Sequence, residues 1–485
     1  MYAPLIAMSE RGDSINTNRL NDYSVGRLLV NLSFPAMVGM VLYSLFSLVD
    51  TFFVARLGAD ALAALTLCIP IELLLCSVGT ATGVGVTSLI SRILGEHNVQ
   101  MANRVAWHGI MICMVYGLLF AYFGLQNMDF LLRFFGCTAE LYVLCKQYLT
   151  VVLFGCLVIF VPLFAGSIVQ GEGNTVLPTI TSLVGICLNI CLDPIFMFGF
   201  GPIPEMGLQG AAIARILAQI GATVLIVTIM IKRPLMLTWS VKNIAPRLSV
   251  LSDIYKVGFP TLVMEIIFVF IMVLLNKTLV GYNHTAVAAL GVFMRIRSLF
   301  YLPISGLAQG VMPIAGFAYG ARNYDRVKEV MIKASVLSFV VLLAGWFLMQ
   351  YHSMWVMSFF SNDPALTFVG INCMKLATIF LPFMGPIIIL YTVLQAVGQG
   401  VSAMWLSLIR TLVFFLPAII ILPHYFSLNG VWLAFSISEG LSILLAFVFF
   451  VRLWKDLQDK QRYTVMVMIK QKTFWQRMKI WLQWK

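Results

Sequence analysis

Long apolar stretches, separated by short polar ones, follow one another along the chain from about residue 28 to residue 452. About 20 apolar residues are enough for a helix to cross the hydrocarbon core of a membrane, and each stretch reaches that length. The pattern therefore predicts an all-α polytopic membrane protein with twelve transmembrane helices. They are placed at 28–55, 61–91, 102–125, 140–168, 176–200, 208–231, 253–280, 286–316, 328–350, 366–396, 402–424 and 429–452.

Charges between the stretches differ on the two sides of the predicted bundle. The loops on one side are rich in Lys and Arg, whereas those on the other side are poor in them. Basic loops remain in the cytoplasm, so this bias places both termini there, as an even number of spans requires. Met1–Ser24 is polar and has no apolar core of a cleavable signal. We expect a multi-pass protein of the cell membrane.

The two halves of the chain repeat each other at a constant offset of 225 residues. Six spans per half is an even number, so both halves enter the membrane from the same side and their repeat axis lies along the membrane normal. This predicts two pseudo-symmetric six-helix lobes with a cavity between them, which is transporter architecture. Matching pairs are Phe34-Pro35 and Phe259-Pro260, Gly85-Val86 and Gly310-Val311, Gly95 and Gly320, and Gln170 and Gln395.

The repeat divides the chain into five segments. They are a cytoplasmic N-terminal segment (1–24), a first lobe (25–231), a cytoplasmic linker (232–252), a second lobe (253–455) and a basic tail (456–485). In the tail, Phe474, Met478 and Trp481 fall near one helical face, which predicts an amphipathic helix on the inner membrane surface. A disordered basic tail that serves only topology is the alternative.

Composition supports a membrane protein and excludes several other classes. The 485 residues are 60% hydrophobic and 11% charged, too apolar for a soluble protein of this size. The net charge is +12, and Arg452–Lys485 supplies much of it, so the basic charge indicates a membrane surface rather than nucleic acid. The nine cysteines show no metal-type spacing, and the five histidines are scattered. We expect no cofactor and no enzymatic activity.

A carboxylate lies inside the first apolar stretch, where charge is costly and marks an ion or substrate pathway by default. This residue is Asp50, and a polar stripe continues along its face of the helix through Ser47, Ser44 and Tyr43. The alternative is an interfacial Asp close to the headgroups, because Arg56 follows closely. We take Tyr43 and Ser47 as candidates for the substrate cavity.

The fifth span carries a second carboxylate in the segment NICLDPIF. Asn189 and Asp193 share one helical face, and Pro194 leaves the carbonyl of Ile190 unpaired nearby. Asp193 and Asp50 each lie roughly 10 Å below the outer surface at about 1.5 Å per residue. Together they predict a site for H⁺ or for a hard cation such as Na⁺ at Asp50, Asn189 and Asp193. Two unrelated helix-end acids are the alternative.

Arg215, in the sixth span, has a comparable depth. A buried arginine needs a carboxylate or water, so we expect it to pair with Asp193 or Asp50. Its fixed positive charge would then disfavour Na⁺ and favour protons, with Asp193 paired and Asp50 titrating. Snorkelling to the outer interface is the alternative.

The second half has its own charged residues inside spans. Glu265 lies near the middle of the seventh span, and Arg295 and Arg297 lie in the eighth, followed by Gln309. Glu265 and Arg295 could form an ion pair that joins two helices, or they could contact substrate. Glu265, Arg295 and Gln309 are therefore substrate-cavity candidates.

Six segments resemble the multidrug and toxic compound extrusion (MATE) family, and more narrowly its MepA-like branch. They are SFP…LVDTFFVARLGADALAAL (33–65), GVGVTSLISRILGEHN (83–98), GEGNTVLPT (171–179), LNICLDPIFMFG (188–199), GLQGAAIA (207–214) and GLAQGVMPIAGFAYGA (306–321).

The resemblance implies twelve helices in two lobes and export of organic cations and other amphipathic drugs, driven by inward H⁺ or Na⁺. It also implies that Asp50, Asn189 and Asp193 form the coupling-cation site. The sequence departs from the family at Arg215, Met312 and Ala318, where relatives often have a small hydroxyl residue, Gln and Asn. These departures bear on the coupling ion and the drug range, not on the fold.

A flippase and an enzyme are the two alternatives to drug export. A lipid-linked precursor flippase of the same superfamily should have a cationic central cavity for its pyrophosphate, whereas this chain has acids in its first half and a mixed set in its second. An enzyme is not expected, because the chain has no HExxH, nucleophile elbow or phosphate-binding loop. The expected partners are small-molecule drugs, H⁺ or Na⁺ and membrane lipids, with the protein acting as a monomer.

Overall fold

The computed structural model describes residues 20, 23–135, 137–232, 237, 247–280, 282, 284–360 and 363–471. Their regular secondary structure is helical, apart from one isolated bridge between Phe200 and Ile203. In the first half the helices are α3 (Val25–Arg56), α4 (Ala59–Gly95), α5 (Val99–Gln126), α6 (Met128–Phe134), α7 (Tyr142–Phe154), α8 (Cys156–Gly171), α9 (Val176–Phe198) and α10 (Gly207–Lys232). In the second half they are α11 (Leu248–Val280), α12 (His284–Gly320), α13 (Tyr324–Tyr351), α14 (Ser353–Ser358), α15 (Pro364–Ala377), α16 (Leu381–Ala396), α17 (Gly400–Leu408), the π-helix η2 (Ile409–Phe415) and α18 (Leu416–Gln471).

The apolar stretches of the sequence form these long helices. Among the described residues, nine helices are long and apolar enough to cross a membrane. Two further spans are bent, by 49° between α7 and α8 and by 54° between α15 and α16, which raises the number to eleven. This confirms an all-helical, multi-pass membrane protein. One long helix also contains a break, since Ser427 inside α18 has φ 50° and ψ −135°.

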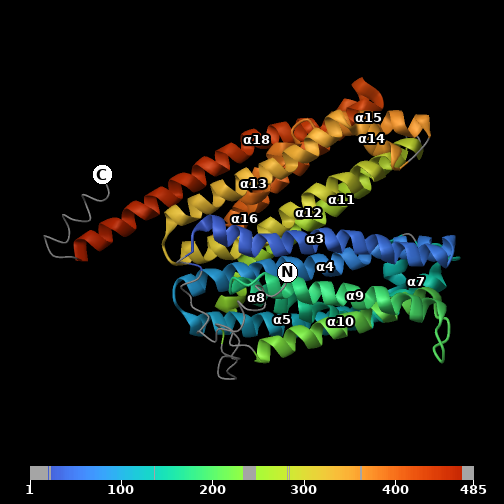
Figure 1. The fold of residues 1–485 in the computed structure, drawn as a ribbon, viewed down its shortest axis with the longest axis horizontal. Coiled ribbons are helices and arrows are strands. Elements are labelled where there is room, and N and C mark those ends of the chain that lie inside the picture. Colours follow the sequence, from blue (N-terminus) through green and yellow to red (C-terminus); the bar gives the residue numbers. More distant parts are fainter. Residues whose placement is uncertain are drawn as a thin grey trace.

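The two halves of the chain form two groups of helices that meet along α3, α4, α11 and α12 (Figure 1). They lie close together at the end where α3 and α13 begin, and they diverge towards the end that carries α7 and α15 (Figure 1). We call the first of these the basic end, because Arg92, Lys256 and Arg326 lie there. The opposite end carries Arg56, where α3 terminates.

The buried core follows the same division. One apolar cluster joins the first half to the part of the second half nearest the basic end, including Ile304 and Leu307 of α12. A second cluster, including Phe293 and Ile296 two to four turns earlier on α12, contains residues of the second half only. The outer part of the second half therefore has a core separate from that of the first half.

Small residues and hydrogen bonds close the basic end. Where α4 crosses α12, a Cβ atom on Gly95 would collide with the carbonyl of Phe317, so only glycine allows the two backbones to approach this closely. Ser88 Oγ donates to the carbonyl of Gln395 at 2.6 Å, and Gln170 Nε2 donates to the carbonyl of Gln309 at 2.7 Å. These bonds cross between the halves.

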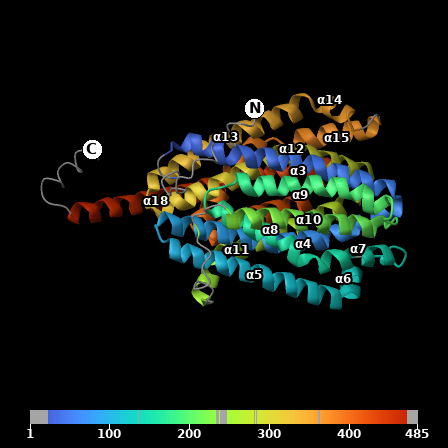
Figure 2. The same cartoon turned by 60° about the horizontal axis from the view of Figure 1, so that its bottom comes forward.

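The last helix, α18, extends beyond the neighbouring helices at the basic end (Figures 1 and 2). Lys460 Nζ donates to the hydroxyl of Tyr319 at 2.9 Å and pairs with Asp456 at 2.7 Å, which fixes this part of α18 against α12. The segment expected as a tail from residue 456 is therefore helical as far as Gln471. The amphipathic helix predicted from Phe474 onward lies outside the described residues.

Candidate functional site

The candidate site of the first half lies where α3, α9 and α10 pack closely towards the opposite end. Gly39 of α3 lies directly against the side chain of Thr179, and Gly185 of α9 lies against Ala222 of α10. These glycines bring the backbones together, so side chains one to three turns further along the three helices converge.

Asp193 is the buried centre of this site, with no exposed surface. Asn189 Nδ2 donates to Asp193 Oδ1 at 2.8 Å, as their spacing of four residues on one helix allows. Asp193 Oδ2 is buried and has no hydrogen-bonding partner in the described structure. A carboxylate oxygen in this condition is costly unless it is protonated or binds a cation.

Asp50 of α3 is half-buried and lies within interaction range of Asp193. The structure therefore brings together the three residues that the sequence suggested as one cluster, Asp50, Asn189 and Asp193. Two carboxylates this close favour a state in which they share a proton or a cation, because both cannot remain charged without a cost.

Arg215 does not form the ion pair that the sequence suggested. Arg215 Nη1 lies 2.5 Å from Glu72 Oε2, and Glu72 also accepts a hydrogen bond from the hydroxyl of Tyr148 at 2.7 Å. The expected pairing of Arg215 with Asp193 or Asp50 is therefore wrong. Glu72 lies inside the second apolar stretch, in the segment IPIELLL, and the rule that singled out Asp50 would also have found it.

The remaining candidates of the first half lie around these groups. Tyr43 is exposed and lies within electrostatic range of Arg215, Glu72 and Asp50. The side chain of Ser47 lies outside the described part of the structure.

In the second half, Glu265 and Arg295 do not form the ion pair that was one of the two possibilities for them. Both side chains are exposed, and no described contact joins them. Instead Arg297 Nη2 lies 2.8 Å from Glu439 Oε1 of α18 and 2.8 Å from the hydroxyl of Tyr301. Arg295 and Arg297 are two residues apart on a helix, so they point to different faces, and only Arg297 faces the helix that carries the carboxylate. Gln309 is half-buried, and its carbonyl takes part in the contact with Gln170.

The ion pairs of the two halves occupy equivalent places in the repeat. Glu72 and Arg297 are 225 residues apart, and Arg215 and Glu439 are 224 residues apart. Each pair joins the second span of its half to the last, but the charges are exchanged. Residue identity between the halves does not reveal this relation, because the equivalent positions carry opposite charges.

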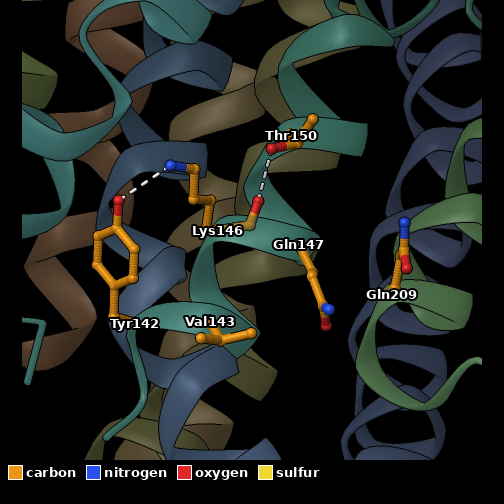
Figure 3. A pocket seen from close by; sticks show the side chains of 6 residues that line it. All are labelled: Tyr142, Val143, Lys146, Gln147, Thr150 and Gln209. Atoms are coloured by element: carbon orange, nitrogen blue, oxygen red, sulfur yellow. Dashed lines mark hydrogen bonds between the residues drawn. The ribbon is translucent and has the colours of Figure 1, made fainter. Parts of the chain in front are cut away.

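A depression on the outer surface of α7 is separate from this site (Figure 3). It has a volume of about 250 Å³ and is lined by Tyr142, Val143, Lys146, Gln147, Thr150 and Gln209. Lys146 Nζ donates to the hydroxyl of Tyr142 at 3.0 Å (Figure 3). None of the acids of the candidate site lines it.

The chain matches one family model twice. The model is MatE, and the matches cover residues 35–195 and 260–420. Both the first and the last residues of the two matches are 225 apart, which is the offset found in the sequence.

Relatives match most of the chain. The multidrug export protein MepA of Staphylococcus aureus (strain MRSA252) is 27% identical over 427 residues, covering 87% of this chain and 92% of that protein. The FAD transporter of Shewanella oneidensis is 25% identical over 416 residues, covering 86% and 92%.

Solved structures agree with the relatives. An outward-facing conformation of a multidrug resistance MATE family transporter of the MOP superfamily has a TM-score of 0.85 and 27% identity, covering 92% of this chain and 100% of that one. A MOP superfamily transporter from Pyrococcus furiosus has a TM-score of 0.85 and 26% identity, with 92% and 99% covered. These findings confirm the resemblance: the chain belongs to the MatE family, the multidrug and toxic compound extrusion transporters.

Proposed function

We propose that this protein is a cation-coupled multidrug antiporter that exports organic cations and other amphipathic drugs across the cell membrane. The observation that carries the proposal is the buried Asp193 with one unpartnered oxygen, next to Asp50. A charge at membrane depth is retained where it serves an ion or substrate pathway. The MepA relative, which is named as a multidrug export protein, supports drugs as the substrates.

The proposed architecture has twelve spans in two six-helix lobes. The segment from α17 to α18 contains two spans if it is divided at the Ser427 break. This adds one span to the eleven described above. Each half then has six spans, and both termini lie on one side. The concentration of Lys and Arg at the basic end supports a cytoplasmic location for that side. The lobes then face outward, because they diverge at the opposite end (Figure 1).

Coupling follows from the charge of the acid pair. Entry of a proton or Na⁺ between Asp50 and Asp193 removes the cost of two neighbouring negative charges in a dry site. An ion that favours one arrangement of the lobes shifts the population towards it by its difference in affinity between the two arrangements. Drug release and cation entry are thereby linked.

Both ions fit the pair. The repulsion expected between Arg215 and Na⁺ is weakened, because Glu72 balances the charge of Arg215. Asp193, Asp50 and the amide of Asn189 supply oxygen atoms of the kind that hard cations bind. The arrangement favours neither H⁺ nor Na⁺ by charge alone.

Drug efflux from membrane vesicles tests the proposal. An imposed pH gradient and an imposed Na⁺ gradient are compared, and at least one is expected to drive efflux several-fold above the rate without a gradient. Vesicles without the protein provide the control. Efflux that responds to neither gradient would contradict cation coupling, and an absence of any drug movement would contradict drug transport itself.

Lipid contacts and a monomeric state complete the proposal. An apolar groove of about 310 Å³ on α5, α8 and α10, lined in part by Trp107, Phe164 and Ile231, has the character of a lipid-facing surface. Each half already supplies its own ion pair, so the candidate site needs no second copy of the chain.

A further inference from the structure

We propose that Glu72 is a positioning residue that holds the guanidinium of Arg215 away from Asp50 and Asp193 and so leaves this acid pair available to the coupling cation. The inference rests on the proposed function for what the acid pair does. The contacts that support it, and the first of its tests, do not depend on transport.

Glu72 is held from two other helices. One of its carboxylate oxygens pairs with Arg215 of α10 at 2.5 Å, and the other accepts from Tyr148 of α7 at 2.7 Å. Tyr148 is nearly fully buried, and the Glu72 side chain is 12% exposed. Arg215 Nη1 also donates to the Tyr148 hydroxyl at 3.3 Å. The three groups therefore form a closed arrangement that fixes the direction of the guanidinium.

Arg215 lies near enough to the acid pair to interact with it electrostatically, and we expect it to turn towards these acids if it were released. Asp50, Asp193 and Tyr43 all lie within its electrostatic range. An arginine cannot lose its charge in a protein, so a released guanidinium must find another anion. At about 6 Å and an effective dielectric near 20, one such charge changes the affinity of the acids for a cation by roughly a hundredfold.

The groups around the acid pair come from five helices. They are Tyr43 of α3, Glu72 and Cys76 of α4, Tyr148 of α7, and Asn189 and Arg215 of α9 and α10. Arg215 is the cation in this set. With Glu72 in place, its charge offsets that of Arg215, and the guanidinium is paired with Glu72 rather than with the two acids.

The second half provides a matched control. Arg297 and Glu439 form an ion pair at the equivalent place of the repeat, with side chains that are 15% and 3% exposed. Glu439 is the carboxylate among the groups that interact electrostatically with Arg297; the others are the phenol of Tyr301 and the thiol of Cys373. Removing the charge of Glu439 therefore leaves Arg297 without a carboxylate partner. Removing the charge of Glu72 instead leaves Arg215 near two other carboxylates, those of Asp50 and Asp193.

The first test measures with which carboxylate Arg215 pairs. R215Q, D193N and the double variant are made in the wild-type and E72Q backgrounds, and Tm is recorded for the purified protein. In the wild-type background, we expect the Tm shift of the double variant to equal the sum of the two single shifts. In the E72Q background, we expect it to be smaller than that sum, because Arg215 has moved to Asp193. E439Q is the control background, in which the shifts should still add.

A second expectation separates positioning from simple stability. E72Q should lower Tm less than E439Q, because Arg215 finds new partners and Arg297 does not. Equal additivity in the wild-type and E72Q backgrounds would overturn the proposal. So would an E72Q protein that fails to fold while E72Q/R215Q folds, because the released arginine would then have found no anion.

A second test asks whether a second substitution restores the drug efflux that E72Q loses. E72Q should lose gradient-driven drug efflux at least tenfold, and E72Q/R215Q should recover most of it, since the double variant again leaves the acid pair without a fixed cation. Full efflux in E72Q would contradict the proposal. If wild-type vesicles respond to no gradient, the proposed function fails, while the Tm measurements still decide where Arg215 pairs.

Discussion

At the scale of single residues, the first half concentrates three carboxylates and one arginine within a few helical turns. Glu72 and Arg215 neutralise each other at 2.5 Å, while Asp193 is bonded to Asn189 through one oxygen only. The other oxygen, Asp193 Oδ2, is buried without a partner in the described structure. A hydrogen bond from a neutral amide does not compensate a buried charge, so this oxygen is where a cation would be stabilised most.

Replacing either acid of the pair by its amide should abolish coupled export. D50N and D193N keep the size and polarity of the side chains but remove the charge that a proton or Na⁺ would balance. We expect at least a tenfold loss of gradient-driven efflux in vesicles, with normal amounts of protein in the membrane.

S182A is the matched control, because Ser182 lies on the same helix as Asp193, is exposed, and donates to the carbonyl of Pro178 on its own helix. It should transport at the wild-type rate. A D193N protein that retains near wild-type, gradient-dependent efflux would show that this carboxylate does not bind the coupling cation.

Part of the candidate site could be predicted from the sequence, and part could not. The sequence predicted that one cluster contains Asp50, Asn189 and Asp193, because regular helix geometry sets both the spacing of side chains on a face and their depth along a span. The partner of Arg215 was not predictable, because pairing depends on how α4, α7 and α10 rotate against one another. Arg295 and Arg297 show the same limit, since a sequence places both in one span but does not say which one faces α18.

At the scale of elements, the broken spans explain why the count of spans differs between sequence and structure. The apolar stretches 140–168 and 366–396 are each continuous in sequence, but each folds as two helices with a bend of about 50°. The stretches 402–424 and 429–452 meet inside α18, where the non-helical backbone of Ser427 marks the break between them. Hydropathy records where the chain is apolar, and not where the helix axis changes direction.

Truncation after Gln461 should leave transport intact. The contacts that hold the end of α18 to its neighbours come from Asp456 and Lys460, which bond to Gln399 and Tyr319 and are retained. We expect an efflux rate within about twofold of the full-length protein, measured by dye efflux and corrected for the amount in the membrane.

Truncation after Lys455 is the matched comparison, because it also removes both anchoring residues. It should lower Tm relative to the longer variant. Complete loss of efflux in the variant that ends at Gln461, despite normal insertion, would show that the distal segment has a role in transport.

At the scale of the whole molecule, the two halves are joined at one end only. The hydrogen bonds from Ser33, Ser88 and Gln170 to carbonyls of the second half all lie towards the basic end. The repeat was predictable from sequence because Pro, Gly and Gln recur at a constant offset. The direction in which the halves diverge was not, because either arrangement satisfies the same apolar pattern.

A disulfide across the closed end should stop transport. A Cβ atom on Gly316 would lie 3.1 Å from Cβ of Ser91, slightly shorter than the usual separation of about 3.5–4.5 Å in disulfides. Oxidised S91C/G316C should therefore lose drug efflux at least tenfold, and a reducing agent should restore it.

The single variants S91C and G316C control for the native cysteines, all of which are free. Oxidation should leave each single variant unchanged. Equal efflux before and after complete cross-linking of the double variant would show that transport does not require the basic end to open.

The exchanged charges of the two ion pairs also restrict how such a chain can evolve. If both halves descend from one duplicated ancestor, one of them has exchanged the Glu and the Arg between its second span and its last. A single replacement would leave two like charges facing each other in a largely buried place, where even one unpaired charge costs about 3–5 kcal/mol. The exchange must therefore have passed through an uncharged intermediate or through paired substitutions. Descendants should accordingly change positions 72 and 215 together, as they should 297 and 439.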